Sequence, residues 1–287
     1  MAVRTEPGLR TCVATKIPLP AEDSAGIFAE ARMIANYHSH TMLCRHATGT
    51  MEEYVLRAME RGLKIFGFSD HSPQWFSGDY YSTMRMYPHE LSEYCEQVRL
   101  LKEKYADKIE ILLGLEVEYY PEIFPELINQ LQDHGVEYML LGQHWSENEY
   151  GEPYNGIATD DVQALKRYCD QTIEAMQTGL FTYFAHPDLL HFVGDKTVYA
   201  EQMRRICKEA KSIDIPLEFN MLGFKTNRHY PSEIFWELAA EEGCKAILGI
   251  DAHKPEDVTE LQPEHDALKI LRKYGIELLE TVPLKKI

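Results

Sequence analysis

Nine residues that can ligate metal ions recur along this chain in one sequence context. Nearly every one follows a short apolar run that is typical of a β-strand. Imidazole nitrogens mixed with carboxylate oxygens suit zinc, iron or manganese. The sequence therefore predicts that the chain returns repeatedly to one point in space and forms a multinuclear metal site there. The nine residues are His38, His40, His46, His71, Glu116, His144, His186, Asp251 and His253.

Two pairs near opposite ends of the chain make this pattern specific. Segment 38–40 reads His-Ser-His, and segment 251–253 reads Asp-Ala-His. Residues i and i+2 of a strand point to the same side, so each pair can reach one cation. One such pair is a weak signal, but two pairs on the first and last strands indicate a shared site.

Four further candidates end strand-like runs between these pairs: IFGFSDH ends at His71, ILLGLE at Glu116, MLLGQH at His144 and FTYFAH at His186. A lone histidine at a strand end is more often an ordinary polar residue, but the shared context favours a metal site. His46 departs from it, because it lies six residues beyond His40. The remaining histidines are interpreted as exposed or structural: His89, His134, His191, His229 and His265.

Strand-like and helical segments alternate regularly between these residues. Strict alternation predicts a parallel sheet. An open doubly wound sheet would draw its ligands from two or three strands, whereas a closed barrel brings all strand ends to one mouth. We therefore predict an α/β fold, a distorted (β/α)7 barrel. The expected strands are 34–40, 64–70, 109–118, 138–145, 180–185, 216–220 and 245–250, and the expected helices are 51–62, 90–105, 122–134, 159–177, 199–211, 232–242 and 264–274.

Two segments fall outside this alternation. Residues 1–32 carry no strand followed by a candidate ligand, so they are expected to be an accessory or expression-derived extension of a barrel that spans 33–287. Segment 147–157 is a long polar loop and is expected to form part of a lid.

The charge and cysteine content limits the classes of partner. The chain of 287 residues has 29 basic and 46 acidic residues, a formal net charge of -17, which disfavours nucleic acid and anionic membranes. Its six cysteines form no CxxC pair, and no run of 18 apolar residues occurs. The simplest interpretation is a reduced, cytoplasmic protein. Its oligomeric state is left open.

The series HxH, a histidine six residues on, SDH, GLE, GQH, AHPD and DAH resembles the motifs of the polymerase and histidinol phosphatase (PHP) superfamily. The stretches HSHTMLCRHATGT and LEFNMLGFKTNRHYPS are similar to its histidinol-phosphatase branch. The resemblance covers residues 33–280. It implies a PHP-type barrel that hydrolyses L-histidinol phosphate, a small phosphate ester, to L-histidinol and phosphate in histidine biosynthesis.

The resemblance also implies three divalent ions, with zinc favoured and iron or manganese as alternatives. Glu116 would bridge two of them, and Glu116, Asp251 and His253 are expected to be catalytic. The implied ligand sets are His38, His40, Glu116 and Asp251 for one ion, Glu116, His144 and His186 for a second, and His46, His71 and His253 for a third.

Phosphate recognition is expected from three basic residues. EFNMLGFK resembles the Glu-x-Asn-x-x-Gly stretch of the family, where a following arginine commonly binds phosphate. This chain has Lys225 at that place, with Arg228 three residues later and Arg45 beside His46. Because lysine lacks the bidentate fork of arginine, the assignment among the three stays open.

Three alternatives compete with this interpretation. The first is a PHP-type phosphoesterase that acts on another small phosphate monoester. The second is an amidohydrolase-like barrel, whose usual bridging lysine is not evident after any strand. The third is a noncatalytic PHP module, which would tend to lose ligands, whereas all nine are retained here.

Overall fold

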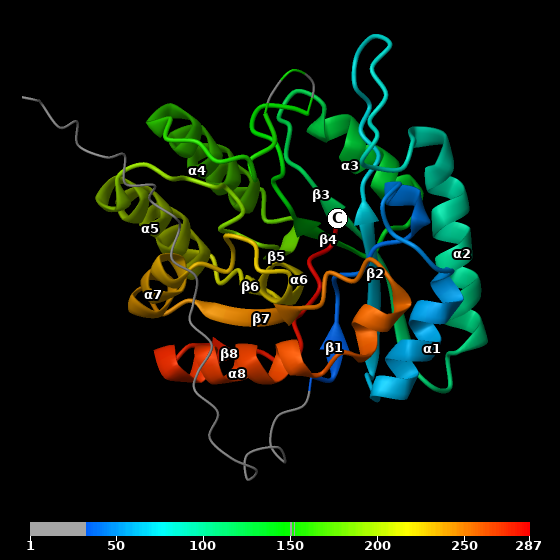
Figure 1. Cartoon of the computed structure of the whole chain (residues 1–287). Coiled ribbons are helices and arrows are strands. Elements are labelled where there is room, and N and C mark those ends of the chain that lie inside the picture. Colours follow the sequence, from blue (N-terminus) through cyan, green and yellow to red (C-terminus); the bar gives the residue numbers. More distant parts are fainter. Residues whose placement is uncertain (1–32, 150, 152) are drawn as a thin grey trace, which may run out of the picture.

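The computed structural model describes residues 33–149, 151 and 153–287, so the predicted extension 1–32 lies outside the described residues. Its strands form one parallel sheet in the chain order β1 to β8, which helices flank on the outside (Figure 1). The strands are β1 Ala35–Asn36, β2 Ile65–His71, β3 Glu110–Val117, β4 Tyr138–Leu141, β5 Phe181–Phe184, β6 Leu217–Asn220, β7 Lys245–Gly249 and β8 Glu277–Leu278.

All seven predicted strands are present, and β8 is an addition that two residues were too few to signal. The predicted helices are present too, and the short helix α6 interrupts a stretch expected to be a loop. The helices are α1 Met51–Arg61, α2 Leu91–Lys104, α3 Phe124–Asp133, α4 Val162–Gln177, α5 Lys196–Ser212, α6 Met221–Lys225, α7 Glu233–Glu241 and α8 Gln262–Tyr274, with 3-10 turns η1 Met42–Cys44, η2 Pro88–Glu90 and η3 Pro255–Thr259.

Helix ends follow local sequence signals. Thr50 caps α1 by accepting from the Glu53 backbone N–H, and the Glu53 carboxylate accepts from the Thr50 N–H in return. Gly62 ends the same helix with φ 87°, a left-handed conformation that glycine adopts without steric cost.

The sheet curls until its first and seventh strands meet beyond their regular ends. Ser39 pairs with Ala252 in a parallel bridge, and the His40 N–H donates to the Ala252 carbonyl over 2.9 Å. Nearer its start, β7 pairs instead with β8. The prediction of a distorted α/β barrel is therefore confirmed, with the distortion located where β7 changes partner.

Alternate residues of each strand serve two different cores. On β3, Ile111, Leu113 and Leu115 pack outward against helices, whereas Leu112 faces the barrel interior. The interior cluster is small and aromatic, with Tyr37, Tyr138 and Tyr183 among its members. The inward series of β3 continues to Glu116, so the residues that precede the candidate ligands fill the barrel beneath them.

The Tyr138 side chain requires glycine at two positions of the barrel interior. A Cβ at Gly67 would lie 2.1 Å from its hydroxyl oxygen, and a Cβ at Gly114 would lie 2.2 Å from its ring. The hydroxyl donates to the Tyr37 carbonyl over 2.7 Å and lies 3.1 Å from the Phe68 carbonyl. Glycines in two strands therefore mark the close approach of one ring rather than a weakness of the strands.

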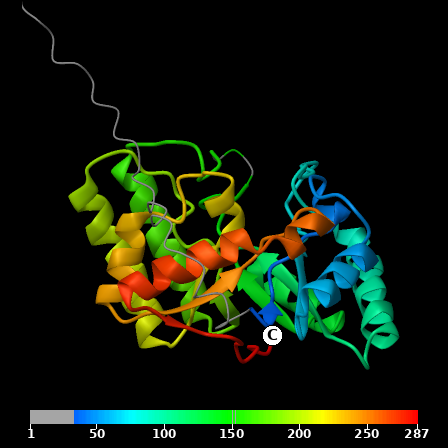
Figure 2. The same ribbon diagram turned by 60° about the horizontal axis from the view of Figure 1, so that its bottom comes forward.

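The C-terminal segment covers the amino-terminal end of the strands. The Val282 N–H donates to the Tyr37 hydroxyl over 3.2 Å, and the Lys285 N–H donates to the Thr182 hydroxyl over 3.2 Å. Figure 2 shows the chain end beneath β1. The candidate ligands gather at the opposite end, where the strands have their carboxyl ends.

Two further findings concern the predicted environment of the protein. None of the described helices is both long and apolar enough to cross a membrane. The described cysteines are free and buried: Cys44, Cys95, Cys169, Cys207 and Cys244.

Tyr138→Phe is expected to lower the free energy of unfolding by about 1–3 kcal/mol, because two buried carbonyls lose their shared donor. Tyr81→Phe is the matched control, since Tyr81 is 69% exposed, and it should change stability by less than about 0.5 kcal/mol. Urea unfolding of both variants measures the difference. Equal stabilities would show that the Tyr138 hydroxyl contributes nothing to the barrel interior.

Candidate metal centre

Glu116 lies at the centre of the candidate ligands. Its side chain is fully buried, and the inward register of β3 carries it to the carboxyl end of the barrel. A Cβ at Gly142 would lie only 2.0 Å from Glu116 Oε1, so the glycine after β4 provides its space. Five histidines each place an imidazole nitrogen within 3.6 Å of one of its two oxygens. They are His38, His40, His71, His144 and His186.

Asp251 approaches the same centre from the end of β7. Its Oδ1 lies 3.1 Å from His40 Nε2 and 3.5 Å from His38 Nε2. The two Nε2 atoms are themselves 3.2 Å apart. Asp251 has φ 53° and His186 has φ 31°, unusual values for non-glycine residues that the surrounding structure must hold in place.

A third group of donors lies on the outer side of this cluster. One nitrogen from each of His46, His71 and His253 lies within 4.8 Å of the other two. The rings of His46 and His253 stack with centroids 4.8 Å apart. The structure thus brings His46 to the strand-end ligands although it lies in a loop.

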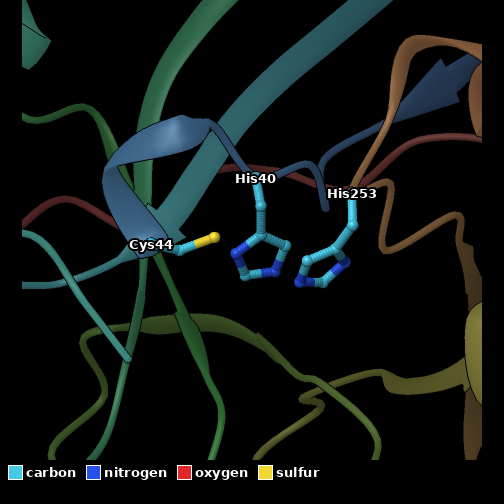
Figure 3. A group of neighbouring side chains, drawn as sticks. All are labelled: His40, Cys44 and His253. Atoms are coloured by element: carbon cyan, nitrogen blue, oxygen red, sulfur yellow. The ribbon is translucent and has the colours of Figure 1, made fainter. Parts of the chain in front are cut away.

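Cys44 also borders the centre, although no sequence motif indicated it. Its buried thiol lies beside the imidazoles of His40 and His253, within 4.8 Å of a nitrogen of each (Figure 3). The Cys44 carbonyl lies 2.7 Å from His46 Nδ1, which can donate to it.

Outer partners orient four of the imidazoles. His38 Nδ1 lies 2.7 Å from Glu218 Oε1, and His144 Nδ1 lies 2.9 Å from Glu118 Oε1. Backbone carbonyls take the same place for His46 and His253. Each Nδ1–H that donates outward leaves Nε2 as a lone-pair donor toward the centre, which is the usual arrangement of metal-bound histidine.

Glu118 and Glu218 were missed by the sequence analysis. A signal existed for Glu118, which lies two residues beyond Glu116 and therefore on the same side of the chain. Glu218 lies in the segment Glu218-Phe219-Asn220, to which no role was assigned from the sequence. A Cβ at Gly249 would lie 1.7 Å from Glu218 Oε1, so this carboxylate too depends on a strand glycine.

Asp70 contacts Thr41 and His40, and it does not contact the imidazole of the adjacent His71 through any described hydrogen bond. Its Oδ2 accepts from the backbone and the hydroxyl of Thr41, and its Oδ1 lies 3.5 Å from His40 Nδ1. It reaches His71 through the backbone N–H, over 2.8 Å. The carboxylate therefore joins the ends of β1 and β2.

The electrostatic balance keeps the carboxylates ionised. Burial opposes ionisation of Glu116, but the imidazoles of His144 and His71 hold its pKa well below the usual range. The pKa of Asp251 is lowered in the same way against burial, first by His38. Burial lowers the pKa of His253 to about 3, so this ring is neutral and can donate a lone pair at neutral pH.

Two carboxylate oxygens of the centre lack a hydrogen-bond donor among the described residues, which favours bound cations as their partners. Glu116 Oε2 and Asp251 Oδ1 are buried, yet neither accepts a well-aligned hydrogen bond from any residue that the structure describes. Buried carboxylate oxygens without a donor are costly unless a cation satisfies them. Mixed imidazole and carboxylate donors of this kind suit zinc, iron or manganese.

A cavity of about 360 Å³ opens above the centre. Seven of the nine candidate ligands line it, and His38 and His186 lie buried beneath. Its other walls are aromatic, apolar or cationic. They are formed by Met84, Trp145, Tyr154, Leu222, Arg228 and Tyr230.

The three predicted phosphate-binding residues occupy different environments. Only Arg228 lines the cavity, where it donates to the Tyr230 hydroxyl over 2.7 Å. Lys225 Nζ instead contacts Asp257 and Glu260, at 2.6 and 2.8 Å. Asn227 lies between them, just beyond α6, in a left-handed conformation with φ 62°.

Arg45 lies outside the cavity lining. Its guanidinium pairs with Glu90 and stacks 4.3 Å from the centroid of the Tyr87 ring. The histidines predicted to be exposed or structural are also absent from the lining, namely His89, His134, His191, His229 and His265.

Comparison with known proteins places these motifs in a family. Residues 36–222 match the PHP domain model. A Deinococcus radiodurans protein named "Probable histidinol-phosphatase" is 30% identical over 258 residues, which cover 84% of this chain and 94% of that protein. A Schizosaccharomyces pombe protein of the same name is 28% identical over 269 residues, 84% of this chain and 87% of that protein.

A solved structure shows the same fold. It is the histidinol phosphate phosphatase of Lactococcus lactis complexed with zinc, L-histidinol and phosphate. The TM-score is 0.67 at 18% sequence identity, and the alignment covers 88% of this chain and 99% of that one. Together with the match over residues 36–222, these likenesses show that the chain belongs to the PHP domain family.

Proposed function

We propose that this protein is a metal-dependent histidinol-phosphatase, which hydrolyses L-histidinol phosphate to L-histidinol and phosphate. The observation that carries the proposal is the convergence of eight candidate ligands around Glu116, at a cavity in which Arg228 supplies a cation. Two relatives named for this activity support the choice of substrate.

The cavity walls suit this substrate in charge and shape. A phosphate monoester is anionic, and the Arg228 guanidinium can hold two of its oxygens with its planar fork. Histidinol carries an imidazole ring, and Trp145, Tyr154 and Tyr230 offer aromatic surfaces against which a ring can pack.

We assign three divalent ions to the donors, with zinc favoured over iron or manganese. His38, His40, Glu116 and Asp251 would hold the first, Glu116, His144 and His186 the second, and His46, His71 and His253 the third. In the first set, the ligand atoms of His38, His40 and Glu116 lie within 4.8 Å of one another, and so do those of the whole third set. The ligand atoms of His38, His186 and Asp251 also lie within 4.8 Å of one another. Bound divalent ions would neutralise phosphate oxygens and lower the pKa of water to about 7.

Neighbouring protein groups orient the ligand side chains. Glu118 and Glu218 keep His144 and His38 in the tautomer whose Nε2 faces the centre. Glu116 Oε1 lies 2.7 Å from His186 Nε2, and Glu116 Oε2 lies 3.5 Å from the Nε2 atoms of His38 and His40. The carboxylate therefore lies between the donors assigned to the first and second ions, as a bridging ligand requires. Among the described residues, no lysine lines the cavity, which disfavours an amidohydrolase with a bridging lysine.

The activity can be tested with a panel of phosphate esters. Purified protein loaded with zinc should turn over L-histidinol phosphate with a kcat/KM at least about tenfold above that for sugar and nucleotide monophosphates, because a pocket that pairs with substrate polar groups discriminates strongly. Higher activity toward another monoester would reject histidinol phosphate as the substrate while leaving phosphatase chemistry intact. No turnover of any monoester would reject the phosphatase proposal.

Glu116→Gln should remove both activity and metal, because a neutral amide cannot bridge two cations as a carboxylate does. We expect a loss of at least about 100-fold in kcat, since the change acts directly on ligands whose outer partners alone are worth 10–100-fold. Elemental analysis should find fewer ions per chain, and chelation of the wild type should reproduce the loss until zinc is restored. Glu110→Gln is a surface control. A Glu116→Gln variant with normal metal content would contradict the bridging role.

Arg228 is expected to bind the phosphate group, whereas Lys225 is not. Arg228→Ala should lower kcat/KM for histidinol phosphate by about 10- to 150-fold, the equivalent of a charge-assisted contact of roughly 1.5–3 kcal/mol. Lys225→Ala, the matched control, should lower stability through its lost contacts with Asp257 while kcat/KM changes by less than about threefold. The reverse result, with Lys225→Ala impaired in kcat/KM and Arg228→Ala normal, would move phosphate binding to Lys225.

A further inference from the structure

Arg85 is a buried cation that contacts none of the nine predicted metal ligands directly. It lies between β2 and α2, and its side chain is 2% exposed. Its Nη1 and Nη2 donate to the two oxygens of Glu118 over 2.6 and 2.9 Å. Nε donates to Glu149 over 2.8 Å, and Nη1 also reaches the Ser72 carbonyl at 3.0 Å. A planar guanidinium thus holds groups from three strand-end segments at once.

Glu118 links this cation to the metal centre. Its carboxylate is fully buried, and Oε1 accepts both from Arg85 and from His144 Nδ1. A carboxylate held by both oxygens cannot rotate away from the imidazole. The chain of contacts therefore runs from Arg85 through Glu118 to the ring of His144, whose Nε2 faces Glu116.

A second arm of Arg85 ties together two walls of the cavity. Glu149 accepts from Arg85 and also from the hydroxyls of Tyr80 and Ser82. Met84 lines the cavity next to Arg85, and Trp145 lines it from the segment that leads to Glu149. In Figure 1 these two segments rise from the carboxyl ends of β2 and β4.

We propose that Arg85 is a positioning residue of the metal centre. By clamping Glu118 it fixes the ring orientation and the tautomer of His144, so that Nε2 presents its lone pair to the metal. The inference rests on the proposed role of His144 as a ligand. The arm to Glu149 has a separate role, which is to hold the segment bearing Trp145 against the segment bearing Met84.

The alternative is that Arg85 only neutralises buried charge. A buried pair that loses one partner destabilises the fold whatever its neighbours do. Stability alone therefore cannot separate the two roles. Zinc affinity can, because a purely structural cation leaves the affinity of the folded protein unchanged, whereas loss of an outer partner of a metal-bound histidine costs about 10- to 100-fold in affinity or activity.

The test compares Arg85→Lys, Arg85→Met and Glu118→Gln by three measurements on folded protein. These are zinc affinity by competition with a chelator, kcat and KM for histidinol phosphate, and thermal unfolding. Arg85→Lys keeps the charge but not the bidentate fork. We expect all three variants to bind the most weakly held zinc about 10- to 100-fold less tightly and to lose kcat. KM should change as well in the two Arg85 variants, because they also lose the contact with Glu149.

Two controls define the pathway. Glu149→Gln should alter KM through the cavity wall and leave zinc affinity normal, whereas Arg205→Met, at an exposed ion pair with Asp170, should change neither. The double variant Arg85→Met with Glu118→Gln should lose no more zinc affinity than either single variant, because both act on one contact.

Normal zinc affinity and normal kcat in folded Arg85→Lys and Glu118→Gln would overturn the inference, whatever the unfolding temperatures show. If Arg85→Met fails to fold, those two variants decide the question. Additive losses in the double variant would also overturn it. The proposed function fails separately, through absent phosphatase activity of the wild type, and the comparison of zinc affinities is read independently of that result.

Discussion

The structure depends on burying the carboxylate of Glu116 among imidazoles. An isolated carboxylate at this depth would be costly, and its oxygen Oε2 has no well-aligned donor among the described residues. Neighbouring histidines hold its pKa low, so the negative charge persists and attracts cations. Gly142 is required because any side chain there would collide with the carboxylate. The barrel can be understood as the scaffold that places this one charge.

An outer layer of polar groups makes the centre definite. Glu218 orients His38, and Glu118 orients His144, while Arg85 supplies the positive charge that keeps Glu118 ionised in a buried position. These groups gain from being fully paired, because a partly satisfied buried network destabilises the protein. The cavity above adds Arg228, so its guanidinium and the candidate metal ligands line the same small volume.

The strand positions and the candidate ligands at the strand ends could be predicted because both follow from local periodicity. A run such as ILLGLE alternates inward and outward residues, and its last inward residue must lie at the barrel mouth. Glu118 could have been found by the same rule. Arg85 could not, because it lies in a long loop whose path is set by contacts with residues far along the chain.

The sequence by itself determined the parallel α/β barrel and the strand-end donors at its mouth, since hydrophobic alternation and strand-end position are local properties. The tertiary structure decided which cation faces the cavity. Lys225 and Arg228 are three residues apart and both cationic, yet Lys225 contacts the carboxylate of Asp257 in η3 whereas Arg228 lines the cavity. Side-chain direction after a turn depends on packing partners distant in sequence, and no local pattern records them.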